Sequence, residues 1–125
     1  MSGKVLLVED EPNITEAIRF LLSREGWKVH THVNGATAIN EIERIKPDIL
    51  VLDMMLPGRS GIDILRDLRD NSEMRNVPVL MLSARGQNRD RELAEAVGVD
   101  RFIAKPFSNK EILEAVQELA EQRYS

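Results

Sequence analysis

Acidic, hydroxyl and basic side chains stand at the ends of several short apolar runs in this chain of 125 residues. Glu9 and Asp10 follow the first run, whereas Asp53, Ser83 and Lys105 follow later ones. A carboxylate nucleophile, further carboxylates that bind a divalent cation, a hydroxyl and an ammonium together describe a phosphoryl-transfer site. In such a site Asp53 would become an aspartyl phosphate, and the hydroxyl, the ammonium and the cation would hold its phosphoryl oxygens.

Strands that alternate with helices must bring these side chains together. Short apolar runs bounded by turn residues predict strands that are buried on both faces. The predicted strands are 4–8, 27–31, 49–52, 78–82 and 101–104, and the second has mixed polarity and is expected near an edge. Pro78 is expected at the first residue of its strand, where no ladder hydrogen bond is lost.

Helical spacing of apolar residues predicts one helix after each strand. Gly26, Pro47 and Gly98 are expected to end the first, second and fourth helices, and Ser108 and Glu111 form a capping box for the last. The residues expected to line the buried faces are Ile14, Ala17, Ile18, Leu21 and Leu22 in the first helix (from residue 13), Ala38, Ile39, Ile42 and Ile45 in the second, Ile64, Leu65 and Leu68 in the third (residues 62–70), Leu93, Ala96 and Val97 in the fourth, and Ile112, Val116 and Leu119 in the last.

Five strand–helix units in strict alternation predict an α/β fold, in which a five-stranded parallel sheet has helices on both faces. Right-handed crossovers leave few topologies, and we expect the flavodoxin-like, doubly wound order 2-1-3-4-5. The whole chain, residues 1–125, is expected to form one domain. Parallel strands place their carboxyl ends at one edge of the sheet, so the polar residues that follow the strands should meet at a crevice there.

Three carboxylates at one edge raise one another's pKa unless a cation neutralises them, and a few hard oxygen ligands suit Mg²⁺. Lys105 could pair with Asp53 or with an incoming anion. Considered singly, each residue has a plainer interpretation: Asp53 as a turn former, Glu9 and Asp10 as charges at a helix start, and Ser83 and Lys105 as loop residues. Their common position at the strand ends favours the phosphoryl-transfer site.

Composition and charge exclude several other classes of protein. The net charge is −4 and no basic run is present, so the chain is not expected to bind nucleic acid. The absence of cysteine agrees with a reducing cytoplasm. The first strand begins too early for a signal peptide, and no apolar run approaches the ~20 residues that span a membrane. We expect a cytoplasmic protein without a membrane partner.

Four stretches in order, VLLVEDEP, DILVLDMMLPGRSG, VPVLMLSARG and FIAKPFS, resemble those of a response-regulator receiver domain of two-component signalling. The resemblance covers the whole chain. It implies that Asp53 is the phosphoacceptor and is charged from a phosphohistidine on a histidine kinase or histidine phosphotransfer protein. It also implies catalysis only of the protein's own Mg²⁺-dependent phosphorylation and slow dephosphorylation, without metabolic turnover.

The same resemblance implies a role for each site residue. Asp10, Asp53 and the backbone carbonyl of Met55 would bind Mg²⁺ directly, and Glu9 would act through a metal-bound water. Lys105 and Ser83 would hold the phosphoryl group. A cis bond between Lys105 and Pro106 is common in the family and permissible here.

The family's switch pairs Ser83 with an aromatic residue, here Phe102, on the fifth strand. Movement of Ser83 toward the phosphate would let the ring turn inward and change the surface formed by the fourth helix, the fifth strand and the fifth helix, which controls an unknown downstream protein. The plainer interpretation of Phe102 is a half-buried strand aromatic. Phe in place of the commoner Tyr removes a hydroxyl that could contact a partner.

Two positions depart from the largest DNA-binding subfamily, whose receivers dimerise through this surface by charge pairs. Where that subfamily has an acid just before the aromatic, this chain has Arg101, and where it has an arginine in the last helix, this chain has Ala115. Other charged residues, Arg91, Asp100 and Glu111, remain. Reversal of one charge and loss of another should abolish that dimer, so we expect a monomer.

Residues near the phosphoacceptor predict a long-lived phosphoryl group. Met55 and Arg85 occupy the positions from which family members tune attack by water, and neither is a carboxylate or an amide that would orient a water. Met55 is also expected to add apolar cover. We therefore expect self-dephosphorylation to take many minutes or longer.

Three rival functions fit the sequence less well. An aspartate-dependent phosphatase usually needs a second carboxylate two residues after the nucleophile, where this chain has Met55. An electron-transfer flavoprotein needs a phosphate-binding loop after the first strand, but the loop here is Glu9-Asp10-Glu11-Pro12. A degenerate receiver that acts as a phosphorylation-independent docking module remains the alternative, and the intact set of site residues argues against it.

The chain ends soon after the last predicted helix, at Ser125. We expect either a stand-alone receiver that signals by docking or a piece of a longer regulator. The departures at Arg101 and Ala115 favour a stand-alone protein or a different class of output.

Overall fold

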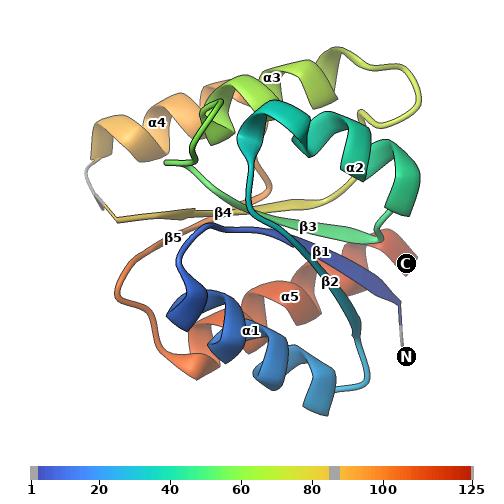
Figure 1. Ribbon diagram of the computed structural model, residues 1–125, viewed down its shortest axis with the longest axis vertical. Coiled ribbons are helices and arrows are strands. Elements are labelled where there is room, and N and C mark those ends of the chain that lie inside the picture. Colours follow the sequence, from blue (N-terminus) through green and yellow to red (C-terminus); the bar gives the residue numbers. More distant parts are fainter. Residues whose placement is uncertain (1–2, 85–87, 125) are drawn as a thin grey trace.

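The computed structural model describes residues 3–84 and 88–124, whose course is shown in Figure 1. Five parallel strands form one sheet in the order β2-β1-β3-β4-β5, which confirms the predicted doubly wound α/β fold. The strands are β1 (Lys4–Val8), β2 (Lys28–His32), β3 (Ile49–Asp53), β4 (Val79–Ser83) and β5 (Arg101–Ala104). The helices are α1 (Pro12–Arg24), the short 3-10 helix η1 (Gly35–Thr37), α2 (Ala38–Ile45), α3 (Gly61–Asp70), α4 (Asn88–Val97) and α5 (Asn109–Tyr124).

The sheet has one helical layer on each face, α1 and α5 on one side and α2, α3 and α4 on the other (Figure 1). Successive strand residues point to opposite faces, so each central strand contributes to two separate apolar clusters. In β1, Leu6 packs in the cluster with α2 and α3, and Leu7 packs in the cluster with α1 and α5. This double burial explains why the central strands are continuous apolar runs.

Local signals begin and end the helices where the sequence predicts. Gly26 and Gly98 adopt φ angles of 93° and 107°, which glycine reaches without the steric cost of a side chain. Ser108 accepts a hydrogen bond from the Glu111 N–H (3.1 Å), and its own N–H donates to the Glu111 carboxylate (2.9 Å), which confirms the capping box.

Two strands are shifted by one residue from their predicted ranges. The second strand is 28–32 and not 27–31, because Trp27 leaves the ladder and donates its N–H to the Leu22 carbonyl at the end of α1 (3.1 Å). The fourth is 79–83 and not 78–82, although the Pro78 carbonyl still accepts from the Leu50 N–H (2.9 Å). The third strand runs one residue further than predicted, so Asp53 itself lies in β3.

The predicted buried face of the fourth helix is wrong. Leu93 is 44% exposed and Ala96 is exposed, whereas Ala94 is fully buried and Val97 is half-buried. Ala94 belongs to the apolar cluster that also contains Phe102, so the small residue and not the large one faces the sheet. Ala17 in α1 is likewise exposed, whereas Ile18 and Leu22 carry the burial of that helix.

Within the described part of the chain, no helix has the length and apolar character to cross a membrane.

Candidate functional site

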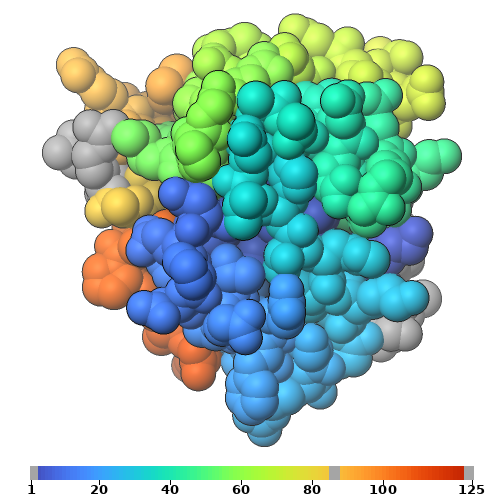
Figure 2. Space-filling model, in the orientation of Figure 1, coloured from blue at the N-terminus to red at the C-terminus, as the bar shows by residue number. Residues whose placement is uncertain are grey.

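The carboxyl ends of β1, β3, β4 and β5 meet at one edge of the sheet. On the left side of Figure 2, the segments that follow these strands (blue, green, yellow and orange) border one another on the surface. Among the described polar and charged residues, those that are buried are Glu9, Asp53 and Ser83, with 1%, 2% and 1% exposed. All three lie at this edge. Burying polar groups costs free energy unless they are paired, so their concentration here marks the edge as a functional site.

Asp53 is fixed at the end of β3 by backbone contacts around it. The Met55 N–H donates to Asp53 Oδ1 at 3.3 Å, and the Met54 N–H donates to the Leu82 carbonyl at 2.8 Å. A Cβ on Gly61 would stand 2.3 Å from the Asp53 carbonyl oxygen, so only glycine lets α3 begin this close to the strand end. These contacts orient the Asp53 carboxylate toward the crevice.

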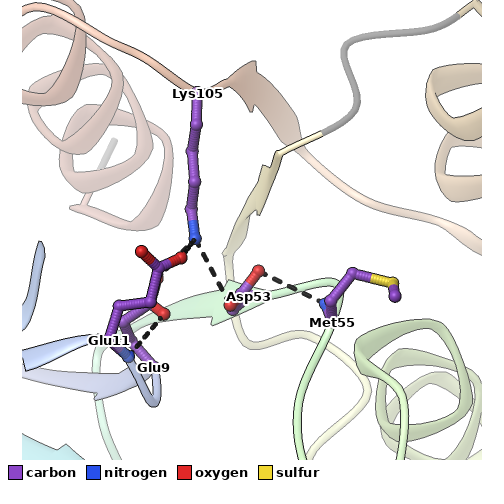
Figure 3. A network of polar contacts seen from close by, with 5 residues as sticks. All are labelled: Glu9, Glu11, Asp53, Met55 and Lys105. Carbon is purple, nitrogen blue, oxygen red and sulfur yellow. Dashed lines mark hydrogen bonds and ion pairs between the residues drawn. The ribbon is translucent and has the colours of Figure 1, made fainter.

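Lys105 lies against the carboxylates, as Figure 3 shows. Its ammonium is 3.0 Å from Glu9 Oε1, 3.0 Å from Glu11 Oε1 and 3.4 Å from Asp53 Oδ2. Burial lowers the pKa of Lys105, but hydrogen bonds to Glu9 and Glu11 and the charges of Asp53 and Glu9 raise that pKa above its ordinary value overall. The lysine is therefore a fixed positive charge within the site. The Lys105–Pro106 peptide bond is cis, as the sequence permits.

Ser83 ends β4 beside the lysine. It pairs with Ala104 in the β4–β5 ladder, and the Lys105 N–H donates to the Ser83 carbonyl at 2.7 Å. The neighbouring Leu82 pairs with Asp53 across the β3–β4 ladder. The structure thus brings the Ser83 and Lys105 strand ends together next to the strand end that carries Asp53.

The three acidic residues of the predicted metal site also come together. One ligand oxygen from each of Glu9, Asp10 and Asp53 lies within 4.8 Å of the others, although Asp10 is exposed and the other two are buried. Carboxylates at this spacing, open to solvent on one side, fit a hard cation such as Mg²⁺ that keeps several waters.

The pKa of Glu9 is shifted by its burial among the other charges of the cluster. Burial raises the pKa of Glu9 to about 7; the Glu11 N–H hydrogen bond lowers it, contact with Asp53 raises it and the Lys105 ammonium lowers it. A site that raises the pKa of a carboxyl group this far favours a bound cation, because a cation stabilises the ionised form.

Met55 and Phe102 lie at the border of the site. Met55 is 54% exposed and its side chain points away from Asp53 in Figure 3, so it does not supply the apolar cover expected from the sequence. Phe102 is only 6% exposed and is therefore buried, and the Arg91 guanidinium lies 5.0 Å from the centre of its ring. Arg85, the second residue expected to bear on dephosphorylation, lies outside the described residues.

Two contacts of the site were not predicted from the sequence. Glu11 pairs with Lys105, and a third acid directly after Glu9 and Asp10 was the available signal for it. The loop after β2 also supports the loop after β3, because the Gly35 N–H donates to the Pro57 carbonyl at 2.8 Å. This backbone contact has no side-chain signature beyond the glycine.

Comparisons with known proteins agree with this geometry. Residues 5–117 match the family model described as the response regulator receiver domain. Among solved structures, the chain resembles the receiver domain of a sensor histidine kinase from Pseudomonas aeruginosa, which has a magnesium ion coordinated in its active-site cleft, with 30% identity, a TM-score of 0.87 and 97% and 99% of the two chains covered. It also resembles the receiver domain of a Francisella response regulator (29% identity, TM-score 0.88, 96% and 98% covered). The beryllofluoride-activated receiver domain of RstA from Klebsiella pneumoniae is similar as well (28% identity, TM-score 0.88, 95% and 99% of the two chains covered).

Proposed function

Because the chain belongs to the response regulator receiver domain family, whose members accept phosphoryl groups, we propose that Asp53 accepts one from a phosphohistidine of a histidine kinase or histidine phosphotransfer protein. The observation that carries the proposal is the burial of Glu9, Asp53 and Ser83 at one sheet edge, with the Lys105 ammonium 3.4 Å from Asp53. A core of this size has no structural need for polar groups gathered at one point.

In the proposed transfer, an oxygen of Asp53 attacks phosphorus as the P–N bond to the histidine ring breaks. The ring nitrogen keeps the electron pair of that bond and leaves as neutral imidazole when the other ring nitrogen carries a proton. Lys105 and Ser83 hold the phosphoryl oxygens during the transfer, and the Met55 N–H keeps the Asp53 carboxylate oriented. Receivers of this kind are not metabolic enzymes.

Mg²⁺ fits the donor set of the site, with Asp10, Asp53 and the Met55 carbonyl as direct ligands and Glu9 acting through water. The close carboxylate oxygens and the raised pKa of Glu9 support this assignment, as does the magnesium ion in the Pseudomonas receiver domain. When bound, the ion supplies charge neutralisation for the phosphoryl oxygens.

Signal output is proposed to follow the Ser83–Phe102 pair to the surface of α4, β5 and α5. Phe102 already lies in the apolar cluster beneath α4, with Arg91 against its ring. A change at Ser83 would therefore reach α4 through the packing of this ring. The downstream partner is a protein that contacts this surface.

The protein is proposed to stay monomeric when it is phosphorylated. Arg101 forms an ion pair with Glu118, and Ala115 is fully buried. Asp100 binds Arg69 at 2.9 Å, and Glu111 belongs to the capping box. Arg101, Asp100 and Glu111 are thus engaged within their own chain.

The direct test is incubation with acetyl phosphate and Mg²⁺, followed by intact-mass measurement. We expect the mass of one phosphoryl group on the parent protein and none on Asp53→Asn. An unchanged parent mass, or an equal gain on the variant, would refute the proposal, and the first result would favour a phosphorylation-independent docking module.

A further inference from the structure

Glu11 has no part in the ligand set proposed above, yet it contacts Lys105 as closely as Glu9 does. Glu11 Oε1 lies 3.0 Å from the Lys105 ammonium, although 94 residues separate the two in sequence. Glu11 is the N-cap residue of α1, but its side chain makes no capping hydrogen bond. Its carboxylate reaches across the mouth of the site to the lysine, as Figure 3 shows.

The three acidic partners of Lys105 differ in how easily they can release it. The side chains of Glu9 and Asp53 are 0% and 3% exposed, whereas that of Glu11 is 56% exposed. A buried carboxylate that loses its cation is left without compensation, but water solvates an exposed one. Glu11 is therefore the partner that Lys105 can exchange at least cost.

An ammonium group has three N–H donors, and the Lys105 ammonium directs two of them to Glu11 and Asp53, while Glu9 lies at ion-pair distance. To reach a phosphoryl oxygen on Asp53, the Lys105 ammonium would turn toward Asp53 and away from Glu11. The Glu11 carboxylate also places a negative charge at the solvent-exposed side of Lys105.

We propose that Glu11 is a positioning residue that holds the Lys105 ammonium at the mouth of the site before phosphorylation. It thereby slows the phosphorylation of Asp53 by small anionic phosphodonors. This inference rests on the proposed role of Asp53. A protein partner that presents phosphohistidine within a docked complex brings its own contacts to offset the opposing charge, whereas a free acetyl phosphate anion does not. Glu11 thereby favours the partner over small donors.

The test compares Glu11→Gln with the parent protein. Glutamine keeps the side-chain length and removes the charge. We expect phosphorylation of Glu11→Gln by acetyl phosphate to be about two- to fivefold faster than that of the parent, since an ion pair with an exposed partner contributes on this scale. The ratio should shrink at high salt, because the Glu11 carboxylate is exposed to screening ions.

Glu16→Gln is the matched control. Glu16 is also exposed on α1, and its replacement by glutamine removes the same charge. Its partner is Arg19 at 3.9 Å, which is not a residue of the site. The Glu16→Gln variant should be phosphorylated by acetyl phosphate at the parent rate. An equal acceleration in both variants would reduce the effect to net charge and overturn the proposal.

A second measurement separates this inference from the proposed function. Crystal structures of the unphosphorylated parent and Glu11→Gln proteins should show the ammonium closer to Asp53 in the variant than the present 3.4 Å. An unmoved lysine, or an unchanged charging rate, overturns the role of Glu11. If Asp53 accepts no phosphoryl group at all, the proposed function fails, and the inference about charging fails with it, whatever the position of the lysine.

Discussion

Lys105 and Glu9 form an ion pair at 3.0 Å, although 9% and 0% of their side chains, respectively, are exposed. Their positions 96 residues apart in the chain (105 − 9) become adjacent only because β1 and β5 end at the same edge of one sheet. Among the described residues Glu9 and Asp53 are the buried acids, so the single charge of Lys105 balances one of them and leaves the other to be neutralised from solution. The pair therefore ties the stability of the metal-free protein to pH.

We predict that Glu9 lowers the stability of the metal-free protein as pH rises from about 4.5 to about 7. The folded protein raises the pKa of Glu9 from 4.5 to about 7, so within this window the folded state binds more protons than the unfolded state. Stability then falls with rising pH by up to about 1.4 kcal/mol per pH unit. Glu9→Gln removes this contribution, so its gain in stability over the parent should grow across the window.

Urea unfolding in EDTA at a series of pH values measures this difference, with Glu16→Gln as the control that should follow the parent. Added Mg²⁺ should flatten the dependence, because the ion stabilises ionised Glu9. A gap between Glu9→Gln and the parent that does not change with pH would contradict the prediction.

Arg69→Ala should destabilise the fold by about 2–4 kcal/mol, because Arg69 links three segments. Its guanidinium donates to the carbonyls of Gly98, Arg75 and Val77 at 2.8–2.9 Å and to Asp100 at 2.9 Å. Lysine cannot replace this planar fork, so Arg69→Lys should recover little.

Arg66→Ala on the same helix is the control for Arg69. Arg66 makes an exposed ion pair with Asp63 at 3.1 Å, and its loss should change stability by less than about 1 kcal/mol. Denaturant unfolding measures both variants. Equal losses for the two would show that the Arg69 contacts contribute no more than a surface ion pair.

The phosphorylated protein should remain a monomer in multi-angle light scattering at increasing concentrations. Arg101 is bound to Glu118 within its own chain and Ala115 offers no charge, so the charge-paired dimer lacks its partners. A phosphorylation-dependent dimer that charge reversal at Arg101 disrupts would be evidence against this expectation.

Purified phosphoprotein should lose its phosphoryl group over many minutes or longer. The Met55 side chain cannot hydrogen-bond a water beside Asp53, whereas an amide can, so Met55→Asn should shorten the lifetime several-fold. Radiolabel decay in the absence of a phosphatase measures both proteins. Decay of the parent within seconds would refute the prediction.

The sequence predicts strands better than it predicts which face of a helix is buried. Double burial makes β3 and β4 continuous apolar runs, and their ends then place Asp53 and Ser83 at one edge. In α4 the apolar residues are few, so two faces were possible and packing placed Ala94 inward. The acid at Glu11 is visible in the sequence, but the direction of the loop after β1, which brings Glu11 to Lys105, depends on tertiary packing.

The backbone hydrogen bond from Lys105 to Ser83 restricts how a signal can leave the site. It continues a ladder in which Ser83 already pairs with Ala104, so the ends of β4 and β5 cannot slide past each other without breaking it. If Asp53 is phosphorylated as proposed, we expect its signal to travel as side-chain torsion, through the rotamers of Ser83 and Phe102, while the β4–β5 ladder keeps its register. The two signalling states should differ in χ1 populations while the amide protection of the β4–β5 ladder stays the same.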